Sequence, residues 1–426
     1  MKKSFFILLL FATLLISCNN EVKTIESTGG IRINLEISTI DLLNEISNYN
    51  RDSIFQLCLE KTNNGKYNSI EEFLQSFNKT VQETNPSIML ASYFISIEMK
   101  DRITFNSTNE EVIEVLKIEI QKKIDETIIN LTKRLENFSE QPANIKVLEY
   151  NLILVEVPGL FEKQRICNLI QSTGNLGFWE TYDNSEVFQY MDAANKKIVE
   201  LGLGENKNVI ETTNKEKTLL DEINSNNDSM QVKSTNENPL FSILFPNVGN
   251  EQKLISGAVV GSADAKDTAL INKYLALRQI NMLFPSNLRF LWTLKPIKDS
   301  NFYQLIAIKV TSRDGRAPLD GSVIVTVKKE EENSYSPIIS MSMNSEGAKI
   351  WSRMTRDNIG KQIAIVLDNY VYSFPVVNDK IESGNSSISG DFSNEEADDL
   401  VSILNAGSCP VKLKVIAVDI KEAPKK

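Results

Sequence analysis

The hydrophobic pattern changes its period twice within the first 160 residues, and this change restricts the fold. Residues 31–37 alternate apolar and polar side chains, which predicts a half-buried strand. Residues 108–135 instead place aliphatic side chains at steps of three and four, which predicts a long amphipathic helix. Residues 145–147 and 152–157 then return to strand-like patterns. A strand–helix–strand–strand order predicts an α+β domain of the ferredoxin-like, split βαβ kind.

Helix starts are marked by a recurring short motif. Ser69–Glu72, Thr108–Glu111 and Ser393–Glu396 each place a hydroxyl residue three positions before a glutamate. This spacing is the capping box, in which the two side chains satisfy free backbone N–H groups of the first turn. We therefore expect a helix to begin at each of the three motifs.

The second half of the chain contains a polar segment followed by another folded block. Residues 204–238 are rich in Asn, Lys, Glu, Ser and Thr and contain no aromatic residue, which predicts a flexible linker. Residues 239–418 regain strand and helix patterns. Within them, two strand-like runs flank Asp368-Asn369, a favourable two-residue hairpin turn.

Composition narrows the classes of function. The 426 residues carry a formal net charge of −10, which argues against a nucleic-acid surface. The absence of histidine removes Ser-His-Asp and Cys-His catalysis and the commonest transition-metal ligand. We expect no catalytic residue, no metal and no cofactor, and we do not expect an enzyme.

The N-terminal segment indicates export. Lys2 and Lys3 precede an apolar run, residues 5–16, that is too short to cross a bilayer as a helix. The run ends in Leu-Ile-Ser-Cys18, which resembles the lipobox of bacterial lipoproteins. This resemblance implies a signal peptide at 1–17, acyl chains on Cys18, a tether at 18–28 and attachment to a membrane of the cell envelope. An ordinary signal peptide with an incidental Cys18, or an uncleaved anchor helix, remain the alternatives.

Three further cysteines bear on the redox state. If Cys18 carries lipid, then Cys58, Cys167 and Cys409 can form at most one disulfide and leave one thiol. The alternative is three small buried thiols.

Residues 337–410 resemble the head of the first periplasmic domain of SecD, a protein-translocation subunit. Weaker similarity extends over residues 29–418, beginning with a double glycine. The positions that match the family's pattern are Gly29, Gly30, Asn344, Glu346, Gly347, Ala348, Asn358, Gly360, Lys361, Asp368, Gly384, Gly390, Phe392, Glu396, Ala397, Gly407 and Pro410. Departures include Ser383-Gly384 where the family has two glycines.

The resemblance implies a base region at 29–203, a head region at 239–418 that sends a C-terminal strand back to the base, and a tail at 419–426. It also implies that the chain, expected to lack the family's membrane helices, cannot couple the proton gradient. The expected role is accessory to Sec-dependent translocation, through binding of emerging unfolded polypeptide or of a translocon component. The alternative is an interaction or inhibitory lipoprotein that reuses the fold outside export.

Three tryptophans are candidates for either core or binding. Trp179, Trp292 and Trp351 are expected in the core, although an exposed one could anchor an apolar peptide. The acidic residues at 395–399 are expected to form the solvated start of a helix.

Overall fold

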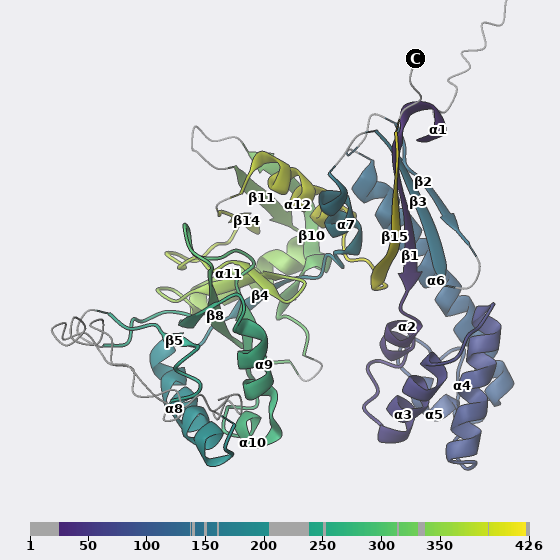
Figure 1. Cartoon of the computed structure of the whole chain (residues 1–426), viewed down its shortest axis with the longest axis horizontal. Helices are drawn as coiled ribbons and strands as arrows, with labels where there is room; N and C mark the ends of the chain where they lie inside the picture. The colour runs from purple at the N-terminus through teal and green to yellow at the C-terminus, as the bar shows by residue number, and fades with distance from the viewer. Residues whose placement is uncertain are drawn as a thin grey trace, which may run out of the picture.

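The computed structural model describes residues 25–136, 138, 141–148, 151–159, 162–203, 238–249, 253–312, 315–330, 337–390 and 392–422. The predicted signal peptide, Cys18 and nearly all of the predicted linker lie outside these residues. The chain forms two bodies that stand side by side (Figure 1). We call them the base body, built on the first strand, and the head body, built mainly from residues 176–406.

The base body contains a four-stranded antiparallel sheet. Its order is β15 (Leu413–Lys421), β1 (Gly30–Ile37), β3 (Leu152–Pro158) and β2 (Asn144–Val147). The first strand lies in the middle, paired with the last strand on one side and with the third on the other. This is the strand order of a ferredoxin-like sheet, so the predicted α+β class is confirmed.

Helices fill one side and one end of the base body. The longest, α6 (Asn109–Leu135), begins with the complete capping box of Thr108 and Glu111 and buries its aliphatic stripe. The shorter helices cluster at the end of the sheet away from α1 (Figure 1). The clustered helices are α2 (Thr39–Ile46), α3 (Ser53–Asn63), α4 (Ile70–Thr84) and α5 (Ala91–Phe94), and α1 spans Ile25–Thr28.

One predicted capping box differs in detail. Ser69 does accept a hydrogen bond from the Glu72 N–H, at 3.1 Å. Helix α4 begins where the motif predicts. Its Glu72 carboxylate, however, accepts a hydrogen bond from the N–H group of Asn68, at 2.9 Å, and not from that of Ser69.

The described part of the head body contains three separate sheets. One has the order β13 (Tyr370–Ser373), β12 (Ile363–Leu367), β4 (Leu176–Glu180), β9 (Leu319–Asp320). The predicted base region 29–203 includes strand β4 and helix α8 (Asn184–Glu200), and in the structure β4 joins a sheet of the head body. Four of the five β4 residues are buried, so β4 needs partners on both edges, and it finds them in β12 and β9.

A second head sheet repeats the split βαβ arrangement. Strand β8 lies between β6 and β7, and the helices α9 and α10 connect β6 to β7. The third sheet has the order β10-β11-β14 and is packed against α11 and α12. The bounds are β5 (Phe245–Pro246), β6 (Val259–Asp264), α9 (Thr268–Ala276), α10 (Arg278–Asn281), β7 (Leu288–Trp292), β8 (Phe302–Lys309), η2 (Gly321–Val323), β10 (Ile324–Glu330), β11 (Ile338–Met343), α11 (Ser345–Asp357), β14 (Asn385–Ile388) and α12 (Asn394–Ala406).

The apolar core falls into one large and two smaller clusters. The large cluster runs from the base body through α7 (Lys163–Gln171) to Trp351 and α12, and the smaller two lie within the head body. All three tryptophans are less than a tenth exposed, as expected. Cys58, Cys167 and Cys409 are buried free thiols, which decides between the two alternatives for these cysteines. Within the described ranges, no helix combines the length and apolarity needed to cross a membrane.

Candidate functional site

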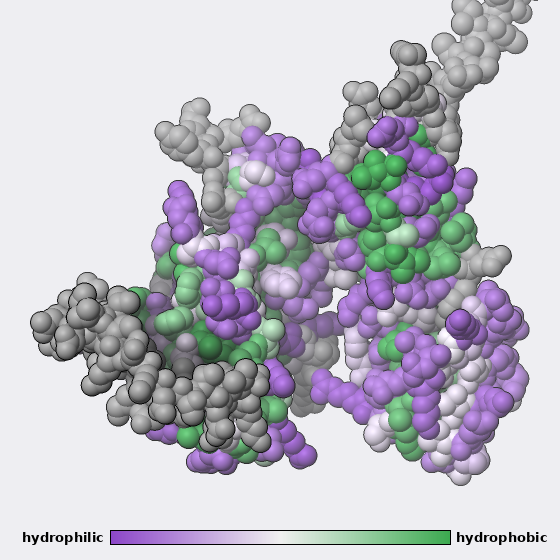
Figure 2. All heavy atoms as spheres, in the orientation of Figure 1, coloured by the Kyte–Doolittle hydropathy of each residue, from purple (hydrophilic) through white to green (hydrophobic). Residues whose placement is uncertain are grey.

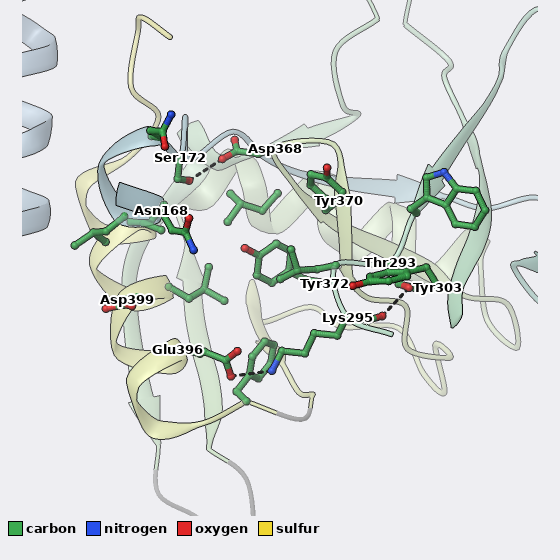
Figure 3. A pocket seen from close by; sticks show the side chains of 18 of the residues that line it. Asn168, Ser172, Thr293, Lys295, Tyr303, Asp368, Tyr370, Tyr372, Glu396 and Asp399 are labelled. Carbon is green, nitrogen blue, oxygen red and sulfur yellow. Dashed lines mark hydrogen bonds and ion pairs between the residues drawn. The ribbon is translucent and has the colours of Figure 1, made fainter. Parts of the chain in front are cut away.

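A cavity of about 800 Å³ opens on the head body, where helices from one side face strands from the other. Helices α7 and α12 form one wall and the β12–β13 hairpin forms the floor (Figure 3). Strand β7, the residues that follow it and α9 form the opposite wall. The cavity therefore joins segments that are more than 200 residues apart in the sequence.

Five aromatic side chains contribute to the lining. Tyr370 and Tyr372 lie two positions apart on β13, so strand geometry aims both to the same side (Figure 3). The Tyr372 and Phe392 rings stack, with centroids 6.5 Å apart. Burial, with smaller contributions from the Asp368 and Glu396 carboxylates, raises the pKa of Tyr372, so its hydroxyl stays neutral at physiological pH. Trp292 and Tyr303 complete the aromatic set.

The hairpin that forms the floor is held by the carboxylate of Asp368. Asp368 and Asn369 both adopt positive φ, 52° and 68°, as a tight hairpin turn requires. The Asp368 carboxylate accepts from the Ser172 hydroxyl at 2.6 Å and from the backbone N–H of Thr173 at 2.9 Å. It also accepts from the Thr173 hydroxyl and from the N–H groups of Gly174 and Asn175. This set of bonds fixes the hairpin against the loop that follows α7.

Ion pairs close the rim of the cavity. Lys295 Nζ lies 2.7 Å from Glu396 Oε2 and 5.4 Å from the centre of the Phe392 ring (Figure 3). Burial alone would raise the pKa of Glu396, but bonding to Lys295 and to Ser393 lowers it below its usual value. On α7, Arg165 binds Asp399 through two bonds of 2.8 Å. The acidic residues of α12 are thus partly engaged in ion pairs.

Behind the cavity, helix α6 of the base body touches the C-terminal ends of two helices: α7, which packs on the base strand β15, and α12 of the head body. Arg134 is fully buried and donates to the Leu169, Ser172 and Gly407 carbonyls at the ends of α7 and α12. Asn130 donates to Gly407 at 2.9 Å and also to the Ala406 carbonyl. A cation at helix C-termini is electrostatically favourable. We call this contact the joint.

Burial affects the polar groups of the joint directly. It lowers the pKa of Arg134, although Cys409 and Asp368 act in the opposite direction. Two buried atoms, Arg134 Nε and Asn130 Oδ1, have no hydrogen-bond partner among the described residues. The joint therefore holds a charge whose main compensation is the set of helix-end carbonyls.

Only a few of the predicted family-motif positions meet at the cavity. Asp368, Phe392 and Glu396 line it. Ala397 lies in the core of α12, and Gly407 ends that helix at φ 79° and supplies a carbonyl to the joint.

The remaining motif positions serve local structure elsewhere. Asn344 caps α11 through the Gly347 N–H at 2.8 Å, and a side chain on Gly347 would collide with Val323. Gly384 approaches Ala348 in the same way. Other motif positions lie in turns, at sheet ends or on exposed surface, and these are Gly29, Gly30, Glu346, Asn358, Gly360, Lys361, Gly390 and Pro410.

The sequence reading missed most of the cavity and the whole joint. Lys295, Tyr303 and Ser172 carry no motif of their own. Arg134 did leave a signal, because it occupies an apolar position of the 108–135 stripe, three residues after Leu131. An arginine at such a position is a candidate for a buried structural cation. Within the described ranges, no group of three His, Cys, Asp or Glu side chains is placed to hold a metal ion.

Comparisons with known proteins find similar sequences. The family model for the P1 head subdomain of SecDF matches residues 306–411. Protein translocase subunit SecD of Rhodothermus marinus is 30% identical over 402 residues, covering 91% of this chain and 60% of that protein. SecD of Rickettsia bellii is 41% identical over 101 residues, or 24% of this chain and 20% of that protein. The chain thus spans less than two thirds of the length of these curated relatives.

Two solved structures are also similar. A crystal structure of SecDF in a super-membrane-facing form covers 93% of this chain and 31% of its own, with 18% identity and a TM-score of 0.41. A structure of the membrane component SecDF that enhances protein export covers 70% of this chain and 92% of its own, with 21% identity and a TM-score of 0.35. From the family and sequence matches, we conclude that this chain carries a periplasmic domain of the SecD/SecDF family, in which residues 306–411 form the P1 head subdomain.

Proposed function

We propose that this chain is a lipid-anchored, extracytoplasmic SecD-type module that assists Sec-dependent protein translocation by holding an extended segment of emerging polypeptide in the head cavity. The observation that carries the proposal is the aromatic lining of that cavity. Five aromatic residues, Trp292, Tyr303, Tyr370, Tyr372 and Phe392, meet there from four separate segments.

Such a lining suits many different polypeptide sequences. Aromatic faces contribute apolar contact area at a low cost in conformational entropy, because each side chain has only two rotatable bonds. The tyrosine hydroxyls and the amides of Asn168 and Asn272 offer donors and acceptors for a peptide backbone. The role needs binding alone and no bond-making chemistry, so we propose a non-enzymatic module.

In-cell photo-crosslinking tests the binding site. A photoreactive amino acid at Tyr370, which is half exposed beside the cavity, is expected to capture secretory polypeptides during export. The matched control places the probe at Ile118, which is 63% exposed on α6 of the base body. Equal capture of secretory chains at both positions, or capture at neither, would contradict the proposal.

The anchor and the energy source are separate parts of the proposal. A Cys18→Ser change is expected to abolish incorporation of labelled palmitate and to release the chain from the membrane fraction. Because the proposed role includes no coupling to the proton gradient, capture at Tyr370 is expected to persist when a protonophore is added to chains already engaged in export. Loss of capture within seconds of that addition would refute this part alone.

A further inference from the structure

A second cavity, of about 520 Å³, lies where the base body faces the head body. Arg51, from the loop between α2 and α3, lines it from the base side. Arg289 of β7, Ser286 and Ser312 line it from the head side. Figure 2 shows a hydrophilic projection of the base body reaching toward the head body in this region. We call this second cavity the arginine cavity.

Arg289 is held in place before any ligand arrives. Its guanidinium lies over the ring of Trp179, 5.8 Å from the ring centre, and Trp179 itself is buried. The guanidinium also lies beside Gly315, where a side-chain carbon would sit 3.6 Å from Nη2. An arginine stacked in this way loses little further freedom when it binds an anion.

Among the described residues, no ion pair is seen between Arg51 and a carboxylate. The adjacent Asp52 is committed to the start of α3, where its carboxylate accepts from the N–H groups of Ile54 and Phe55 at 3.0 and 2.9 Å. Two residues with positive φ, Asn48 and Tyr49, shape the loop that presents Arg51.

The charge balance of the arginine cavity differs from that of the first cavity. No aspartate or glutamate is among the described residues that line it. Elsewhere in the described chain, Arg32, Arg102, Arg165 and Arg356 each form an ion pair with a carboxylate. In a protein of net charge −10, the described lining of this cavity thus holds two arginines and no carboxylate, which makes it a local positive site.

We propose that the arginine cavity binds a carboxylate of an acidic polypeptide segment, gripped between Arg51 of the base body and Arg289 of the head body. The guanidinium fork matches a carboxylate through two parallel hydrogen bonds. The cavity is larger than a lone inorganic anion requires, and Leu275, Phe284 and Phe290 supply apolar walls for the flanking parts of a peptide. The polypeptide nature of the ligand rests on the proposed function, whereas the anionic preference rests on the two arginines.

The test uses the full chain in detergent and a fluorescent decapeptide that carries one central glutamate. Fluorescence anisotropy at low salt is expected to show binding that weakens about tenfold when the peptide's glutamate is replaced by glutamine, because a charge-assisted bond is lost. Arg289→Gln and Arg51→Gln are each expected to weaken binding of the glutamate peptide by a similar factor. Arg353→Gln, which removes an exposed arginine of α11, is the charge-matched control and is expected to change it less than twofold.

Further arms identify the ligand class and protect against misfolding. Inorganic phosphate at millimolar concentration is expected to displace the glutamate peptide, since both are oxyanions. Arg289→Lys keeps the charge but loses the fork, so an intermediate affinity with an unchanged circular dichroism spectrum supports the assignment. Equal binding of the glutamate and glutamine peptides, or undiminished binding by Arg289→Gln, would overturn it.

The peptide-binding test of the arginine cavity and the crosslinking test of the aromatic cavity can fail independently. If the glutamate peptide fails to bind while probes at Tyr370 still capture secretory chains, then only the arginine cavity is wrongly assigned. If the glutamate peptide binds but Tyr370 captures nothing, the carboxylate site stands and the proposed polypeptide site at the aromatic lining fails.

Discussion

The base body and the head body bury their apolar residues in different ways. In the base body, one sheet of four strands is closed by helices, and side chains such as Phe55, Phe73 and Phe77 are fully buried. In the head body, three sheets of four, four and three strands meet, and the aromatic cavity lies between two of these sheets and helices α7, α9 and α12. The cavity lies where separate sheets and helices meet, so its lining side chains remain available to a ligand. The base body therefore buries its aromatic side chains in a core, whereas the head body leaves several of them lining a cavity.

The largest expected effect is a difference in stability between two variants, each of which replaces one aromatic side chain by alanine. Phe77→Ala in α4 removes a ring that packs edge-on against Phe55, with centroids 5.7 Å apart, and is expected to lower the free energy of unfolding by about 4 kcal/mol. Tyr372→Ala in the cavity is expected to cost only about 2 kcal/mol, because its side chain is already partly exposed. Chemical denaturation measures both, and equal losses would erase the contrast.

The joint tests whether the two bodies unfold together. Arg134→Ala leaves a buried site without its cation and deprives the carbonyls of Leu169, Ser172 and Gly407 of this donor, and it is expected to cost about 3 kcal/mol. The neighbouring Lys133→Ala, on the exposed side of α6, is the control and should change stability by less than about 0.5 kcal/mol. Two separate denaturation transitions in Arg134→Ala, against one in the wild type, would show that the joint couples the bodies. A loss as small as that of the control would refute its role.

A third prediction concerns order within the head body. Asp368→Asn keeps the shape of the side chain but removes the charge that accepts bonds from residues 172–175, and it is expected to cost about 2 kcal/mol. Hydrogen exchange should quicken in the β12–β13 hairpin while the base sheet stays protected. Asp379→Asn, at an exposed position, should alter neither quantity. Unchanged exchange in the hairpin of Asp368→Asn would contradict the assigned role.

The smallest expected effect is a pH dependence located in the head body. Burial alone would raise the pKa of Asp183, but bonds from Ser185, Ser256 and Gly257 lower it from 3.8 to about 2. A carboxylate with a lowered folded-state pKa stabilises the protein above its unfolded pKa, and this contribution fades as the pH falls from about 4 to 2. Because Asp183 is partly exposed, solvent screening leaves about 1 kcal/mol.

The matching measurement compares the wild type with Asp183→Asn by denaturation at several pH values. The difference in unfolding free energy should be largest above about pH 5 and should shrink steadily below pH 4. Asp101→Asn, at an exposed position of the base body, serves as the control. A difference that is independent of pH would mean that hydrogen bonding at this site does not depend on the charge.

Local features of this chain could be predicted from the sequence. The alternation after Gly30 predicted β1, the stripe at 108–135 predicted α6, and Asp368-Asn369 predicted the hairpin turn. Each of these features depends on residues close together in the chain, so periodicity and turn chemistry suffice to find it. The family pattern also predicted the head subdomain, because its matching residues are spread over many strands, helices and turns.

The pairing of distant segments could not be predicted in the same way. Nothing near β4 indicates that Leu176 will face Leu367 across a sheet, because the two residues are 191 positions apart in the sequence. The lining of the aromatic cavity likewise comes from segments whose local patterns predict only strands and helices.

The sequence by itself determined where the strands, helices and turns of this protein form, because those choices depend on side chains within a few positions of one another. Only the tertiary structure decided which side chains share a cavity, since that depends on how sheets of different size close against each other. Arg51 and Arg289 illustrate the difference: 237 intervening residues separate two unremarkable arginines that the packing of two bodies brings to one cavity.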